Sequence, residues 1–191
     1  QELKLELRLA QLERNEACQN NFLQFVRRLW PEFITGRHHE IIAEKLERVA
    51  KGELKRLIIN MAPRHTKSEF ASFLFPAWMM GRKPNMKIIQ ATHTTELAVN
   101  FGRKTKNMID SDDYKEIFPE VKLAADSKAS GRWDTSAGGM YYAVGVGSNL
   151  AGRGGDLVII DDPHSEQTAM SNNGFDDAWE WYTGGPRQRL Q

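Results

Sequence analysis

The first half of the chain carries its apolar residues at spacings that predict helices. Residues 1–30 consist mostly of Leu, Glu, Lys, Arg, Gln and Ala, which favour helices, and contain neither Pro nor Gly. Leucines alternate between positions 3 and 9 as they would in a strand, but β-branched residues are almost absent, so we expect a helix. From 37 to 52, apolar residues at helical spacing form one face of a second predicted helix, which Gly52 ends.

Short apolar runs and helical segments then alternate along the middle of the chain. Buried strands are predicted at 57–59 and 86–91, and helices at 68–80 and 94–109. Because this βαβα order is typical of a parallel sheet covered by helices, we expect an α/β fold.

Glycine changes the pattern between residues 126 and 155. Eight glycines surround a short aromatic run at 140–144, which predicts a hairpin followed by a mobile loop. The apolar run 157–160 predicts another buried strand, and it ends in Asp161 and Asp162. A last, Trp-rich helical region is expected from 175 to 190, with an interruption at 184–186.

Composition places the chain among globular proteins. Its 191 residues are 40% hydrophobic and 27% charged, enough for one compact domain with a real core. The net charge of +1 gives no argument for nucleic acid, so such a partner has to rest on local charge, as in the Lys- and Arg-rich stretch 82–106. The single cysteine, Cys18, excludes an internal disulfide and is expected to be buried on a helix. No apolar run approaches the roughly 20 residues of a membrane span and no leader is visible, so we expect a cytosolic protein.

The segment 61–68 lies between a predicted strand and a predicted helix, which is the context of a phosphate-binding loop. In such a loop backbone N–H groups hold phosphates, a lysine reaches the outer phosphates, and a hydroxyl holds Mg²⁺. Lys67 and Ser68 stand at the positions for these two side chains. However, Met61 and Thr66 occupy the positions where the strict pattern has glycine, so an ordinary polar turn before a surface helix is the alternative.

The acidic pair after the run 157–160 is a second candidate for nucleotide chemistry. An apolar strand ending in an acid is how nucleotide hydrolases hold Mg²⁺ opposite the phosphate loop. Taken alone, Asp161 and Asp162 equally fit a strand-to-helix turn with acidic caps. Together with Lys67 and Ser68 after another strand, they favour nucleotide hydrolysis over either simpler interpretation.

Several stretches resemble the large terminase subunits of tailed bacteriophages. Residues 62–69 are similar to the variant phosphate loop of that family, in which Pro-Arg-x-x-Lys-Ser is common. The segments 75–78, 114–119, 144–154 and 157–163 also resemble it, in the family's order. The likeness runs from about residue 30 to the end, whereas the first thirty residues match nothing. It implies a RecA-like P-loop ATPase core over 31–191, with a mostly parallel sheet and helices on both faces, after a helical segment at 1–30.

The resemblance also implies a function and partners. Large terminase subunits hydrolyse ATP to drive double-stranded DNA into a procapsid in the host cytoplasm, together with a portal protein and a small terminase subunit. They work as a ring of copies, and a nuclease domain follows the ATPase domain. We therefore expect this chain to stop inside the motor domain, to be a monomer, and to bind ATP and Mg²⁺ better than it hydrolyses ATP.

Roles carry over to positions that match the family's pattern. Lys67 would contact the phosphates, and Ser68 and Asp161 would hold Mg²⁺. The full nucleotide-binding set is Pro63, Arg64, His65, Thr66, Lys67, Ser68 and Glu69. His38 and His39 precede a helix where this family often reads the adenine, but simple helix capping is the favoured role.

Four residues are candidates for catalysis. Many relatives have Glu after the metal-binding acid, where this chain has Asp162, so the water-orienting carboxylate is Asp162 or Glu166. Arg64 would sense the γ-phosphate, or simply pair with Glu69 at the surface. Arg153, in a glycine-rich loop, would act as an arginine finger in a neighbouring subunit, or is a solvated loop charge.

Other functions stay open on the sequence. One is another RecA-like DNA translocase or helicase, and a second is a nucleotide-dependent assembly module without useful hydrolysis. A third is a free-standing metal nuclease built on Asp156, Asp161 and Asp162.

Overall fold

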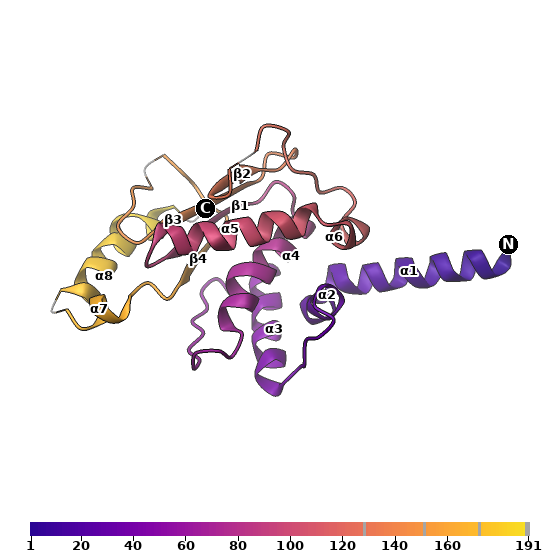
Figure 1. Cartoon of the computed structure of the whole chain (residues 1–191), viewed down its shortest axis with the longest axis horizontal. Coiled ribbons are helices and arrows are strands. Elements are labelled where there is room, and N and C mark those ends of the chain that lie inside the picture. The colour runs from indigo at the N-terminus through magenta and orange to yellow at the C-terminus, as the bar shows by residue number, and fades with distance from the viewer. Residues whose placement is uncertain (128, 151, 172, 190–191) are drawn as a thin grey trace.

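The chain folds as an α/β protein in which helices pack against a four-stranded sheet (Figure 1). The computed structural model describes residues 1–127, 129–150, 152–171 and 173–189. The strands are β1 (Lys87–Thr92), β2 (Arg132–Asp134), β3 (Met140–Gly145) and β4 (Leu157–Asp161). The helices of the first half are α1 (Glu2–Asn20), α2 (Phe22–Leu29), α3 (Arg37–Ala50), the π-helical η1 (Glu69–Leu74) and α4 (Phe75–Arg82). Those of the second half are α5 (Thr95–Asp110), α6 (Asp112–Ile117), α7 (Glu166–Ala169), α8 (Gly174–Gly184) and the short 3₁₀ helix η2 (Pro186–Gln188).

The sheet is mixed and mostly parallel, with the strand order β2-β3-β1-β4. β1 pairs in parallel with both β3 and β4, and β2 forms the expected antiparallel hairpin with β3. The register places Thr92 beside Gly145 on one side and beside Asp161 on the other. The carboxyl ends of β1, β3 and β4 therefore meet at one edge of the sheet, where open α/β sheets bind their ligands.

Both faces of the sheet are covered, as the apolar strands require. Ile88 faces the large core that α2, α4 and α5 complete, and Figure 1 shows α5 lying across the sheet. Ile89 and Ala91 face a smaller cluster that contains Leu150 and is covered by Trp181 of α8. A strand buried on both faces carries apolar residues at successive positions, which is why β1 and β4 were visible in the sequence as continuous apolar runs.

The segment 1–30 is helical, as expected, but it forms two helices. The backbone of Asn21 is extended, with φ −127° and ψ 120°, and its side chain accepts a hydrogen bond from the Gln24 N–H to cap α2. Residues 1–14 are exposed, and Figure 1 shows α1 projecting from the body of the protein. In contrast, α2 buries Phe22, Phe25 and Val26 in the main core.

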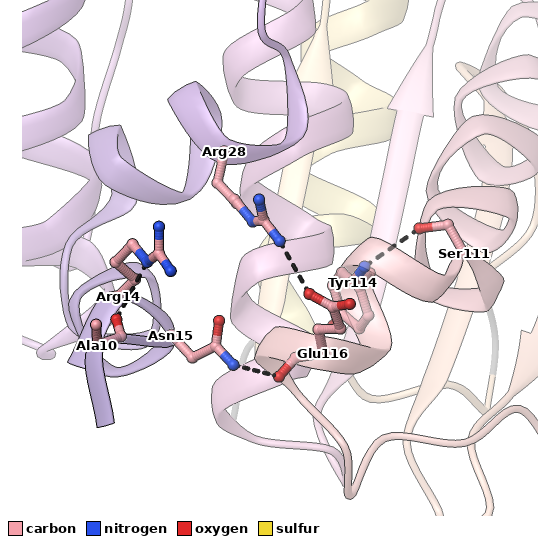
Figure 2. Close-up of polar contacts among 7 residues, drawn as sticks. All are labelled: Ala10, Arg14, Asn15, Arg28, Ser111, Tyr114 and Glu116. Atoms are coloured by element: carbon pink, nitrogen blue, oxygen red, sulfur yellow. Dashed lines mark hydrogen bonds and ion pairs between the residues drawn. The ribbon is translucent and has the colours of Figure 1, made fainter. Parts of the chain in front are cut away.

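Polar contacts between α6 and the two N-terminal helices hold them in place (Figure 2). The Asn15 side chain of α1 donates a 2.8 Å hydrogen bond to the carbonyl of Glu116, and Arg28 of α2 forms a 2.9 Å ion pair with the carboxylate of the same residue. Cys18 is buried, as expected, and burial raises the pKa of its thiol. These contacts fix the C-terminal part of α1 against the domain.

The strand predicted at 57–59 is wrong, because the structure has no strand there. Leu57 and Ile59 are half-buried against the main core, while Ile58 is 85% exposed. This alternation of buried and exposed side chains is typical of an extended chain. A β-strand also needs a neighbouring strand that shares its backbone hydrogen bonds. In the described part of the chain, β4 is the edge strand on its side of the sheet and pairs only with β1.

Candidate functional site

The 61–68 loop has a backbone conformation that few residues adopt. Arg64 and Thr66 lie in the left-handed region, with φ values of 64° and 62°. Thr66 is β-branched, so this conformation costs on the order of 1–3 kcal/mol, whereas a glycine would adopt it without strain. The strict phosphate-loop pattern has glycine at this position. The chain thus keeps the backbone that such a glycine allows while carrying a threonine.

Backbone donors of the same loop are open. Between Arg64 and Ser68, no backbone N–H donates a hydrogen bond to another described residue. Lys67 and Ser68 are helical and lead directly into η1, so these donors also lie at a helix N-terminus, where the helix dipole favours anions. Ser68 makes no capping hydrogen bond with its side chain, which leaves its hydroxyl for another partner. The loop therefore has the donor set that a phosphate group needs.

Lys67 brings this loop to the carboxyl end of β4. Its Nζ lies 2.5 Å from Asp162 Oδ1 and 3.8 Å from Asp161 Oδ1. Asp161 is buried, and its other carboxylate oxygen accepts a 2.9 Å hydrogen bond from Ser72 Oγ of η1. Two segments that are more than ninety residues apart in the sequence thus meet through a lysine and two carboxylates. The structure thus brings Lys67, proposed for phosphate binding, together with Asp161, proposed for metal binding, and with Asp162, whereas no contact of Ser68 with these three is recorded among the described residues.

Asp162 sits in a strained turn directly after β4. Its φ of 40° is in the left-handed region, and its carbonyl accepts hydrogen bonds from the backbone N–H of His93 at 3.3 Å and from His93 Nδ1 at 3.2 Å. The carboxylate is 62% exposed and points to Lys67. Aspartate tolerates this conformation better than most residues, and the two His93 contacts hold the turn.

A surface cavity of about 600 Å³ adjoins this turn. Its lining residues are His93, Asp162, Pro163, His164, Ser165, Glu166 and Gln167. Glu166 begins the short helix α7, is exposed, and has no recorded contact with Lys67 among the described residues. Both candidates for the water-orienting carboxylate therefore border one cavity, but only Asp162 touches the lysine.

Among the described residues, Arg64, His65 and Glu69, which flank Lys67 in the sequence, have no recorded contact with Asp161 or Asp162. Arg64 is exposed, and Glu69 pairs at 2.8 Å with Lys104 of α5, not with Arg64. The Nδ1 of His65 donates a 2.9 Å hydrogen bond to the carbonyl of Pro63, which closes the turn. These contacts shape the loop and leave the Arg64 guanidinium facing solvent.

Arg153 lies away from the carboxyl edge of the sheet. Its guanidinium stacks over the ring of Tyr142, 3.6 Å from the ring centroid, and Tyr142 is three residues before the end of β3. The Nη1 atom is buried and has no hydrogen-bond partner among the described residues. The structure does not bring Arg153 together with Lys67 within this chain, so its role as a finger for a neighbouring subunit stays a prediction.

The basic stretch 82–106 is largely engaged within the protein. Arg82 stacks on Trp78 at 4.6 Å, Lys104 pairs with Glu69, and Lys106 donates to the carbonyl of Ser127. The two lysine contacts hold α5 against η1 and against the segment at Ser127, while the Arg82 contact lies within α4.

The described residues contain no cluster of three or more His, Cys, Asp or Glu side chains that could hold a metal ion by themselves. Asp156 lies at the opposite end of β4 from Asp161, roughly 16 Å away for five residues of strand, and accepts a hydrogen bond from the Lys87 N–H. The nuclease centre considered from the sequence is therefore wrong. Mg²⁺ bound with a nucleotide needs fewer protein ligands, because the phosphates and water complete its shell.

Three residues touch the site in ways that the sequence did not predict: Ser72 and His93 were not named as candidates, and His39 was considered only for adenine reading or helix capping. Ser72 follows Ser68 by one helical turn, so its side chain lies on the same helix face and reaches Asp161. His93 follows β1 as Asp162 follows β4, and register alone places both at the same edge. His39 of α3 lies 2.6 Å from Thr66 through its Nε2, a contact for which the sequence carries no signal.

Comparison with models of known protein families gives no match to this chain, and neither does comparison with curated proteins. None of the helices in the described part of the chain is both long and apolar enough to cross a membrane.

Proposed function

We propose that this chain is the ATPase part of a bacteriophage large terminase subunit, which hydrolyses ATP to translocate double-stranded DNA into a procapsid. One observation carries the proposal. A lysine from a left-handed loop with open backbone donors meets two carboxylates at the carboxyl end of a parallel strand. This is the arrangement of charges that phosphoryl-transfer enzymes use for nucleotides with Mg²⁺.

Each residue has a defined role in this proposal. Lys67 and the open N–H groups of the 61–68 loop bind the phosphates, and Ser68 and Asp161 hold Mg²⁺, which neutralises charge on the phosphates when bound. The Ser72 hydrogen bond keeps the Asp161 carboxylate oriented. Asp162 orients a water molecule, whose oxygen bonds to the γ-phosphorus as the bond to the ADP oxygen breaks, and accepts its proton. Arg64 is proposed to approach the γ-phosphate, and Arg153 to act on the site of a neighbouring copy.

We propose that Lys67 changes its partner when a nucleotide binds, from the Asp162 carboxylate to the phosphates. In the described structure the Lys67 ammonium is neutralised by Asp162 at 2.5 Å. Nucleotide phosphates would compete for the same ammonium, and their binding would release the Asp162 carboxylate for its role toward water.

The substitution Asp162→Asn is therefore expected to strengthen ATP binding about two- to fivefold, because it removes an exposed ion pair worth up to about 1 kcal/mol. Asparagine keeps the shape and tolerates the positive φ, so the turn persists. Calorimetric titration of the wild-type chain and the variant measures the effect, with Asp177→Asn on the exposed face of α8 as the control. A clear loss of affinity in Asp162→Asn would contradict the partner exchange.

Turnover distinguishes the two carboxylates. In the longer terminase that the sequence resemblance implies, Asp162→Asn should abolish phosphate release while ATP still binds, because loss of a general base typically costs 10²- to 10⁴-fold. Glu166→Gln should retain most of the rate. If Glu166→Gln is the inactive variant and Asp162→Asn stays active, the two roles are reversed.

The partners in the proposal are double-stranded DNA, a portal protein, a small terminase subunit and further copies of the chain, in the host cytoplasm. Stimulation of ATP turnover by double-stranded DNA supports a motor over an assembly module without useful hydrolysis. A nuclease domain in the longer protein separates a terminase from another RecA-like translocase or helicase.

A further inference from the structure

His39 links the helical N-terminal half of the protein to the 61–68 loop. It is buried on the first turn of α3, between the rings of Phe33 at 4.7 Å and Phe70 at 5.1 Å. Its Nδ1 accepts a 2.8 Å hydrogen bond from the backbone N–H of Gly36, which caps the helix as the sequence favoured. Its Nε2 lies 2.6 Å from Thr66 Oγ1.

The hydrogen bonds assign the proton on this imidazole. Because the Gly36 N–H donates to Nδ1, Nδ1 carries its lone pair and the proton of the neutral ring resides on Nε2. Nε2 then donates to Thr66 Oγ1, and the Thr66 hydroxyl donates in turn to the carbonyl of His65 at 2.6 Å. Every donor in this chain of hydrogen bonds has an acceptor. The side chain of Thr66 is thereby held from both sides.

Thr66 is also where the loop is most strained for its residue type. Its φ of 62° is unfavourable for a β-branched residue, so the conformation persists only if other contacts stabilise it. The two hydrogen bonds of Thr66 Oγ1 are such contacts. The next residue is Lys67, whose direction toward Asp161 and Asp162 depends on the backbone at Thr66.

We propose that His39, acting through Thr66, is a positioning residue of the nucleotide site: its Nε2–H holds the left-handed backbone that aims Lys67 at the phosphates. This rests on the proposed function, because it concerns affinity for a nucleotide. It explains how a loop with threonine in place of glycine keeps the geometry of a phosphate loop. His39 does this only as a neutral imidazole. If Nδ1 were protonated, two hydrogen-bond donors, Nδ1–H and the Gly36 N–H, would point at each other.

The surroundings of His39 favour the neutral form. Burial lowers the pKa of His39, and the neighbouring His38 and His65 lower it further. The other faces of the ring contact the apolar side chains of Phe33 and Phe70, while the charged Arg37 and Glu40 on its own helix are exposed. Between the ordinary imidazole pKa of about 6.5 and the lower value in the folded protein, the unfolded chain binds more protons. The free energy of unfolding therefore falls as the pH decreases through this window.

A double-mutant cycle in the 191-residue chain tests the proposal. His39→Asn places an amide oxygen where Nδ1 lies, so it can still accept from Gly36, but it cannot reach Thr66. We expect it to lower ATP affinity about three- to tenfold, the net effect of one hydrogen bond. Thr66→Gly takes the same backbone without strain and has no hydroxyl for His39 to hold, so its own ATP affinity is measured as the second reference of the cycle. In the Thr66→Gly background, His39→Asn should then cost almost nothing.

Each outcome of the double-mutant cycle either supports or overturns the positioning role of His39. Equal losses from His39→Asn in both backgrounds would show that His39 acts on general stability or on the nucleotide directly, and would overturn the proposal. No loss in the wild-type background would overturn it too. The affinity of the wild type, but not of Thr66→Gly, should also decrease as the pH falls through the lowered pKa of His39, which lies below the ordinary imidazole value of about 6.5.

A nucleotide-free readout separates this inference from the proposed function. The ¹⁵N spectrum of the histidine rings shows which nitrogen of His39 carries the proton, with His39→Asn used to assign the signal. At pH 7 we expect Nε2 protonated and Nδ1 unprotonated. An Nδ1–H tautomer or an imidazolium overturns the positioning role even if ATP binds, whereas the expected tautomer without ATP binding contradicts the proposed function alone.

Discussion

The variant Lys67→Ala is expected to bind ATP about 10- to 100-fold more weakly than the wild-type chain. Lys67 supplies a charge-assisted hydrogen bond, worth about 1.5–3 kcal/mol, at the point where the 61–68 loop meets Asp161 and Asp162. Isothermal titration calorimetry of both proteins measures the difference. It is the largest effect on nucleotide binding that we expect from one substitution.

Lys115→Ala serves as the matched control. Lys115 lies in α6, outside the loop and the strand ends that form the candidate site, and forms an exposed ion pair with Asp110. Its replacement by alanine removes one positive charge, as Lys67→Ala does. The control should bind ATP like the wild type. An unchanged affinity in Lys67→Ala would show that the 61–68 loop does not bind phosphates.

The variant Phe22→Ala is expected to lower the free energy of unfolding by about 3–5 kcal/mol, the usual cost of removing a large buried ring. Phe22 is fully buried and packs against Phe70, Phe75 and Trp78, with ring centroids 5.6, 5.7 and 5.4 Å away. Phe70 belongs to η1 and Phe75 to α4, the two consecutive helices that follow the 61–68 loop. Urea unfolding followed by circular dichroism measures the loss.

Leu7→Ala in α1 is the control for this effect. Leu7 is 60% exposed, so its truncation should change stability by no more than about 0.5 kcal/mol. A loss for Phe22→Ala as small as that for Leu7→Ala would contradict the placement of α2 in the main core. The expected difference would show that the first thirty residues divide into an exposed helix and a helix that supports the site.

Periodic segments were predicted well because their pattern records local packing. The helix from Arg37, the helix from Thr95, the β2–β3 hairpin and the strand at 157–160 all form as expected. Each has either one apolar face at helical spacing or a continuous apolar run with turn residues beside it. The strand expected at 57–59 failed because an apolar run predicts burial but does not supply a pairing partner.

The candidate site was predicted in its residues but not in its geometry. Their places after apolar runs singled out Lys67, Asp161 and Asp162, but only the tertiary structure shows that the Lys67 side chain reaches both carboxylates at the end of β4. The left-handed backbone at Thr66 could not be predicted, because β-branched residues disfavour it. His39, which stabilises it, lies 27 residues earlier on another helix, so only the tertiary structure reveals the pair.

The central claim is that this chain binds a nucleotide with Mg²⁺ at Lys67 and Asp161. Calorimetric titration of the wild-type chain with ATP, in the presence of Mg²⁺ and again after chelation of Mg²⁺ with EDTA, tests it most directly. The account predicts saturable binding of one ATP per chain, competition by ADP, and a clear loss of affinity when Mg²⁺ is removed. Absence of saturable binding at millimolar ATP, or binding that neither EDTA nor Lys67→Ala weakens, would contradict it.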